Sequence, residues 1–187
     1  MIFDVKMEDI NLKARLLTGV HVIEPPATIT YESIESRGTF SIALTLAALN
    51  YFPVKVAHIK NDFITAHVTY KIWTVLIPDF GKHAVRKAIL VHALYGLKSA
   101  GAAFQNHWEY CMHHLVFLPC PAELDIWTKP MVMPDYGFNY YTYVLIHVEY
   151  VMVIQHDAEI VLRRIDKYSK LNPSSIFLTL TFIWGPS

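Results

Sequence analysis

The feature that most constrains this chain is a long apolar run from Tyr140 to Ile154, which carries His147, Glu149 and Tyr150 near its middle. A typical strand has about five or six residues, so the run is too long for one strand. A membrane-spanning helix needs about 20 mostly apolar residues, so the run is also too short and too polar to cross a bilayer. We therefore expect two apolar strands hinged near Val148 to Tyr150, and no transmembrane segment.

The rest of the chain alternates between strand and helix patterns. Strands are predicted over Lys13–Val22, Val54–Ile59, Lys71–Ile77 and Ala88–His92, and helices over Ser36–Asn50, over Ser99–Leu115 and from Asp157 to about Tyr168. Ser36 or Thr39 is expected to cap the first helix and Asp157 the last. This order predicts an α+β fold, in which an antiparallel sheet has its helices packed on one face.

Composition supports one ordinary domain over residues 1–187. Hydrophobic residues make up 53% of the chain and charged residues 17%, which is enough apolar material for a large core. The formal net charge is zero, which excludes a strongly basic surface of the kind that binds nucleic acid over the whole protein. The two cysteines do not form a disulfide framework, and no signal peptide is recognised, so an intracellular location is expected.

The most specific motif is Ala93 to Phe104, which reads ALYGLKSAGAAF. It resembles the ALYGLKQAPRAW block of copia-type retrotransposon reverse transcriptases. Further blocks match this family in the same order: Lys13–Leu16 is similar to KARLV, Tyr31–Arg37 to TYSSVVSR, Ile59–Phe63 to the end of DIKNAF, Cys120–Trp127 to the segment ending ADPSLF, and Val144–Val153 to the hairpin LVYVDDII.

The resemblance implies a fingers-and-palm polymerase core that acts on an RNA or DNA primer–template and a deoxynucleoside triphosphate. In the family, aspartates on neighbouring strands hold two Mg²⁺ ions, which suit hard oxygen ligands. Those catalytic positions fall on His58, Glu149 and Tyr150 of this chain. Glu149 alone is a carboxylate, and Asp62 is not expected to replace the lost ligand. We therefore predict weak metal binding at Glu149 and impaired polymerisation.

The resemblance also implies a nucleotide site. Lys13 and Arg15 fall where the fingers hold the triphosphate, and Phe63 falls where the family has an aromatic gate against the ribose 2′ hydroxyl. Ser99 stands where the family has glutamine. The alternative function is a non-catalytic remnant that binds nucleic acid or protein, and a third hypothesis is a poorly folded product with no selected function.

Two further features lead to separate expectations. His107, Cys111 and His114 share one helical face, with Cys120 close behind, which is a zinc hypothesis weighed against ordinary helix packing. Residues 176–187 depart from the family pattern and resemble a shifted reading frame, and no segment matches the family's thumb or RNase H domain. Phe182 and Trp184 in this apolar tail predict self-association.

Overall fold

A computed structural model describes residues 2–6, 11–15, 37–133, 137–147, 149–172 and 178–180. The chain divides into two compact units. The first unit contains the described residues of Met1–Glu32 together with Phe63–His107, and the second contains those of Ser33–Asp62 and Trp108–Ser187. The predicted outer segments of the chain, including Leu16–Val22 of the first strand, the Ser36 cap, Phe182 and Trp184, lie outside the described residues.

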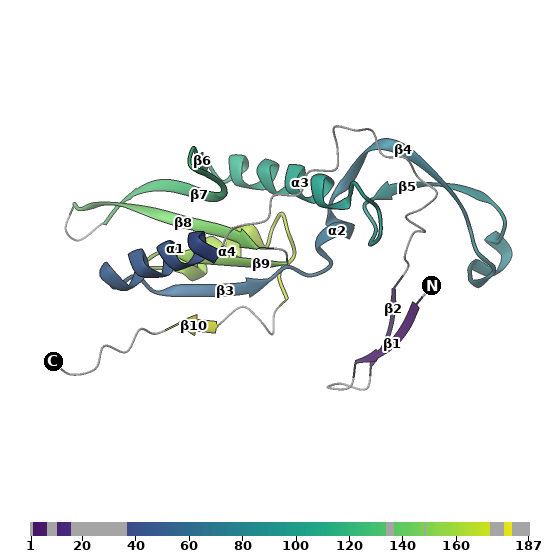
Figure 1. Cartoon of the computed structure of the whole chain (residues 1–187), viewed down its shortest axis with the longest axis horizontal. Helices are drawn as coiled ribbons and strands as arrows, with labels where there is room; N and C mark the ends of the chain where they lie inside the picture. Colours follow the sequence, from purple (N-terminus) through teal and green to yellow (C-terminus); the bar gives the residue numbers. More distant parts are fainter. Residues whose placement is uncertain are drawn as a thin grey trace. The chain divides into compact units, whose positions relative to one another are not determined.

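The second unit is built on a six-stranded sheet in the order β10-β3-β9-β8-β7-β6, in which neighbouring strands pair antiparallel (Figure 1). Its strands are β3 (Val54–His58), β6 (Leu118–Cys120), β7 (Glu123–Val132), β8 (Asn139–His147), β9 (Tyr150–Ile154) and β10 (Leu178–Leu180). The predicted antiparallel α+β architecture is therefore confirmed at this level. The apolar run forms β8 and β9, as its length predicts.

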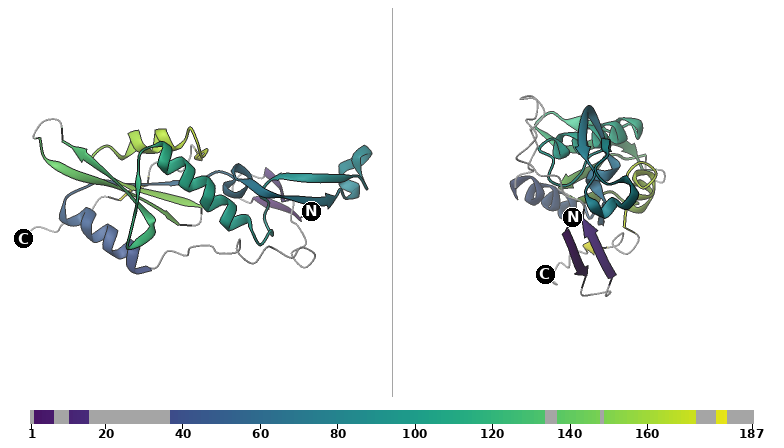
Figure 2. Two further views of the ribbon diagram at one scale, coloured as in Figure 1. Left: turned by 90° about the horizontal axis from the view of Figure 1, so that it is seen from above. Right: turned by 90° about the vertical axis from the view of Figure 1, so that its right-hand side faces the viewer.

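Helices cover both faces of this sheet (Figure 2). Helix α1 (Arg37–Leu49) packs through Ala43 and Ala47 into a core cluster that includes Met152 of β9. Helix α4 (Ala158–Ile165) instead contacts Lys55 of β3 through Glu159. Val56 pairs with Met152, and successive side chains along a strand point to opposite faces, so Lys55 points away from α1. The two helices therefore lie on opposite faces of the sheet. The expectation that the helices pack on one face is wrong, since both faces of the central strands are apolar.

The central strands explain this two-sided packing. Val151, Val153 and Ile154 of β9 are fully buried, so side chains that point to either face need a cover. The α1 side is closed by small residues, because Ala43 and Ala47 let the helix approach the sheet closely. The larger residues Ile42 and Leu49 of the same helix are 63% and 62% exposed.

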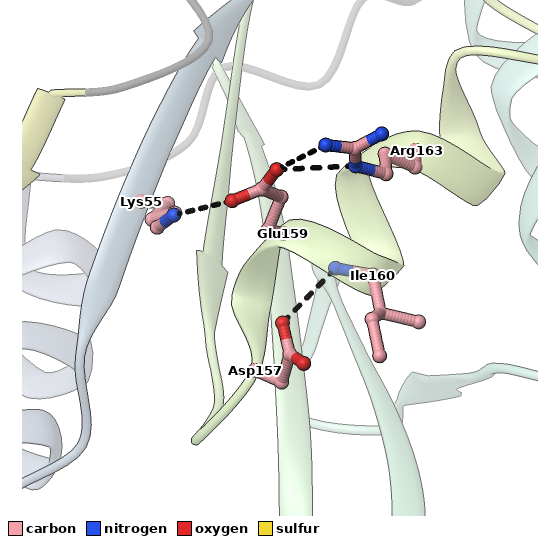
Figure 3. Close-up of polar contacts among 5 residues, drawn as sticks. All are labelled: Lys55, Asp157, Glu159, Ile160 and Arg163. Atoms are coloured by element: carbon pink, nitrogen blue, oxygen red, sulfur yellow. Dashed lines mark hydrogen bonds and ion pairs between the residues drawn. The ribbon is translucent and has the colours of Figure 1, made fainter.

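Helix α4 begins at the predicted cap, and Figure 3 shows the contacts of its first turns. The carboxylate of Asp157 accepts a hydrogen bond from the Ile160 N–H at 3.3 Å. Glu159 accepts hydrogen bonds from Arg163 and, at 3.1 Å, from Lys55, and these two cations lower the pKa of its carboxyl group. The helix ends at Ile165 rather than near Tyr168, where the chain continues as turns.

The first unit has a two-stranded ribbon of β4 (His67–Val75) and β5 (Lys87–His92), joined through the 3₁₀ segment η2 (Pro78–His83). A second ribbon pairs β1 (Ile2–Lys6) with β2 (Asn11–Arg15). The short helix α2 (Asp62–Thr65) contributes Phe63 to this unit, and α3 (Ala100–His114) contributes its residues up to His107. The predicted strands near 71–77 and 88–92 and the helix over 99–115 are confirmed.

Within the part of the chain that is described, no helix combines the length and the hydropathy needed to cross a bilayer.

Candidate functional site

The end of β3 and the turn between β8 and β9 bring the predicted catalytic positions together. His58 is the last residue of β3 and pairs in register with Tyr150, the first residue of β9. Tyr150 also pairs with His147 at the end of β8. The three residues therefore form one row across three adjacent strands, and Glu149 lies in the turn beside it.

Direct contacts fix this group. His58 Nε2 lies 3.2 Å from Glu149 Oε2, and the His58 ring meets the Tyr150 ring edge-on with 5.2 Å between centroids. The Ile59 N–H donates a 2.6 Å hydrogen bond to the Glu149 carbonyl, which ties the turn to the strand end. The side chains of His58 and Glu149 are 27% and 39% exposed, so the pair borders solvent.

The row lies on the α1 side of the sheet. His58 is two residues beyond Val56, which packs on the cluster beneath α1, and alternate strand residues share a face. The Phe40 ring of α1 meets the His147 ring edge-on at 5.3 Å. Phe40 and Val56 thus border the polar group on the α1 side, while the side chains of His58 and Glu149 stay partly exposed.

This donor set does not fit a pair of Mg²⁺ ions. Mg²⁺ demands octahedral oxygen coordination, while His58, His147, Glu149 and Tyr150 offer one carboxylate, two imidazoles and one phenol. The single carboxylate already contacts His58, so a cation would compete with that imidazole for it. Among the described residues, no three His, Cys, Asp or Glu side chains are placed to hold a metal ion. Asp62, at the start of α2, is only 3% exposed.

In the first unit, Phe63 and Ser99 both lie in packed surroundings. The Phe63 ring meets those of Tyr95 and Phe104 edge-on, at 5.0 Å and 6.1 Å between centroids. Ser99 is 2% exposed, and its hydroxyl accepts a hydrogen bond from the Tyr70 hydroxyl. A nucleotide contact by Ser99 would require this buried hydrogen bond to open, whereas Phe63 is only half-buried.

Lys13 and Arg15 lie on β2, where they pair in register with Asp4 and Ile2 of β1. The strand prediction is confirmed for this part of the segment. Their proposed role at a triphosphate stays a prediction from the resemblance.

The residues of the zinc hypothesis do not form a metal-binding group in the described structure. Cys111 is fully buried on α3, and burial raises the pKa of its thiol to about 12, which opposes the thiolate form that binds zinc. His114 Nδ1 lies 2.9 Å from the Tyr110 carbonyl, and its ring contacts that of Tyr110 at a tilt of 41°. Packing of α3 accounts for Cys111 and His114.

One juxtaposition was missed by sequence reasoning. His67 and His92 face each other across the β4–β5 ribbon, with ring centroids 4.3 Å apart. Counting the hairpin register outward from Val75 and Lys87 places His92 opposite Tyr70, and a register shift between His67 and Ile72 brings it opposite His67 instead.

Comparison of the chain with protein-family models, with curated proteins and with solved structures finds no match.

Proposed function

We propose that this chain is a catalytically impaired derivative of a copia-type reverse transcriptase, in which a His58–Glu149 pair occupies the place of the two-Mg²⁺ centre. The observation that supports this most is a coincidence of position. The resemblance assigns the metal ligands to the end of one strand and to a hairpin far away in the sequence, and His58 Nε2 and Glu149 Oε2 lie 3.2 Å apart. The strand–hairpin arrangement is thus compatible with the inherited site.

The chemistry of the present residues supports the loss of polymerisation. Two divalent cations beside one carboxylate are poorly neutralised, and imidazole favours softer metals than Mg²⁺. The phenol of Tyr150 is 47% exposed and is a poor ligand in its neutral form. The remaining His58–Glu149 pair can form hydrogen bonds, but with one carboxylate it lacks the charge that would hold the metal ions.

The test is metal binding and primer extension by the whole chain and by the variant H58D/E149D/Y150D. The unchanged chain is expected to extend no primer with Mg²⁺ or Mn²⁺. The variant is expected to bind Mn²⁺, measured by calorimetry or by its electron paramagnetic resonance signal. The matched control is Tyr141→Asp, which adds a negative charge at a 53% exposed position on β8 and should bind none.

Two results would contradict the proposal. Extension by the unchanged chain would show that the pair does not disable catalysis. A folded triple variant with no more Mn²⁺ affinity than Tyr141→Asp would show that these three positions are not a former metal site.

A second candidate function is non-catalytic binding of single-stranded nucleic acid. Between Phe63 and His107 the sequence has one acid, Asp79, and its lysines and arginine are all exposed: Lys71, Lys82, Arg86, Lys87 and Lys98. Trp73, between them on β4, is 60% exposed and offers a ring for base stacking. A neutral chain thus carries a locally basic ribbon.

This candidate predicts a salt-dependent gel shift of an oligonucleotide without extension. Trp73→Ala should weaken binding about tenfold, because stacking on one base contributes about 1–3 kcal/mol. Leu46→Ala, at a 38% exposed position on α1, is the control. Equal affinities for the two variants would contradict a role for the ribbon.

A further inference from the structure

Two histidines meet at the base of the β4–β5 ribbon. His67 is the first residue of β4, His92 is the last of β5, and the two pair in register. The neighbouring Ala93 N–H donates a 2.9 Å hydrogen bond to the Ala66 carbonyl. Because this hydrogen bond joins the residues just outside His67 and His92, the two histidines form a non-hydrogen-bonded pair. Facing side chains come closest in pairs of this type.

The rings are placed within reach of one metal ion. Their centroids are 4.3 Å apart and their planes are tilted by 35°. Two zinc–nitrogen bonds of about 2.0–2.1 Å at a tetrahedral angle put the nitrogen atoms about 3.3 Å apart. To share one ion the rings must turn so that a nitrogen of each faces it, and the exposed His67 can turn without disturbing a buried core.

The pair also has an unsatisfied ligand atom. His92 Nδ1 is buried and has no hydrogen-bond partner within the described part of the chain. A buried polar atom without a partner is costly, and coordination would remove that cost. His67 is exposed, so water can fill the remaining coordination positions.

We propose that His67 and His92 form a two-histidine site for a borderline transition-metal ion of the Zn²⁺ class. Imidazole nitrogens select Zn²⁺, Ni²⁺ and Cu²⁺ over Mg²⁺. No third His, Cys, Asp or Glu joins the pair among the described residues, so the site is open and binds more weakly than a four-ligand structural zinc centre. The ion would connect the two strands of the ribbon, and the proposal is independent of the function proposed above.

The test is calorimetric titration of the untagged whole chain with Zn²⁺, and with Mg²⁺ as the hard-ion comparison. One Zn²⁺ site is expected, with no Mg²⁺ heat at this site. His67→Ala and His92→Ala should each weaken Zn²⁺ binding about tenfold or more, because each removes one of the two ligand nitrogens. His83→Ala, which removes an exposed histidine from η2 of the same ribbon, should leave the affinity unchanged.

A thermal melt supplies a second measurement, because an ion that binds only the folded chain raises its melting temperature. Zn²⁺ should raise the melting temperature of the unchanged chain and of His83→Ala, but not of His67→Ala. If His92→Ala does not fold, His67→Ala decides, since its side chain is exposed. Absence of Zn²⁺ binding by the unchanged chain, or equal affinities of His67→Ala and His83→Ala, would overturn the proposal.

Discussion

His58→Asp would place two carboxylates side by side at the end of β3. In the unchanged chain, His58 Nε2 lies 3.2 Å from Glu149 Oε2. Aspartate has a shorter side chain than histidine. With its oxygens about 5 Å from those of Glu149, the repulsion is about 1 kcal/mol at the dielectric constant of water and about 3 kcal/mol at the effective value of about 20 that suits a protein surface. We expect the free energy of unfolding at pH 7 to fall by an amount within this range.

The effect of the added charge on the free energy of unfolding can be separated from the effect of losing the imidazole ring. His58→Asn also removes the edge-on contact with Tyr150, but it adds no charge. Urea unfolding of both variants at low ionic strength gives the electrostatic part as the difference between them. Millimolar Mg²⁺ should stabilise His58→Asp and leave His58→Asn unchanged, because a cation can bridge two carboxylates. Equal stability of the two variants, together with no response to Mg²⁺, would refute the placement of His58 beside Glu149.

Three further predictions concern the helices. Leu162→Ala, at a fully buried position of α4, should lower the free energy of urea unfolding by about 2–5 kcal/mol, whereas Ile160→Ala, 47% exposed on the same helix, should change it by less than about 0.5 kcal/mol. Burial raises the pKa of Cys111 to about 12, so a thiol reagent at pH 8 should label Cys120 alone in the native chain and both cysteines in urea. Rapid labelling of a native Cys120→Ser variant would contradict this prediction. Asp157→Ala should cost about 1 kcal/mol in the same unfolding assay, because the Asp157 carboxylate caps α4.

The elements with a strong period were predictable from the sequence. Phe104, Trp108 and Met112 recur at helical spacing, and all three are buried on α3. The run from Tyr140 to Ile154 forms two strands, because its polar centre coincides with the turn. These predictions depend only on local pattern and length, which tertiary contacts here reinforce.

Strand β7 was not predicted, and Pro130 explains why. Proline interrupts a strand pattern because it cannot donate a ladder hydrogen bond. In the sheet, Pro130 pairs with Tyr141 of β8, while the other neighbour β6 pairs only with residues up to Thr128. Proline therefore lies where β7 is an edge strand, so the missing donor has no partner to lose. That compensation depends on the length of β6, which local sequence does not reveal.

The candidate site shows a second limit of prediction from local sequence. Nothing in the periodicity of β3 or of the β8–β9 hairpin says that these strands are neighbours, and only the family resemblance predicted that His58 and Glu149 would lie together. The reverse holds for Ser99, where the resemblance suggests a nucleotide contact but the hydroxyl is buried against Tyr70. A family resemblance can predict which distant residues lie together, but it does not predict whether a side chain such as Ser99 is already hydrogen-bonded and buried.

The position of His58 explains how residues at the end of β3 can be exchanged while the fold persists. Along β3 the first row, at Val54, is fully buried, whereas His58 at the strand end is partly exposed. The free energy of the sheet therefore comes from the rows at Val54 and Val56, which pack against Met152 and Ile154. A partly exposed polar contact such as that between His58 and Glu149 contributes at most about 1 kcal/mol. Exchange of charges at the last row thus alters what the site can bind far more than it alters whether the chain folds.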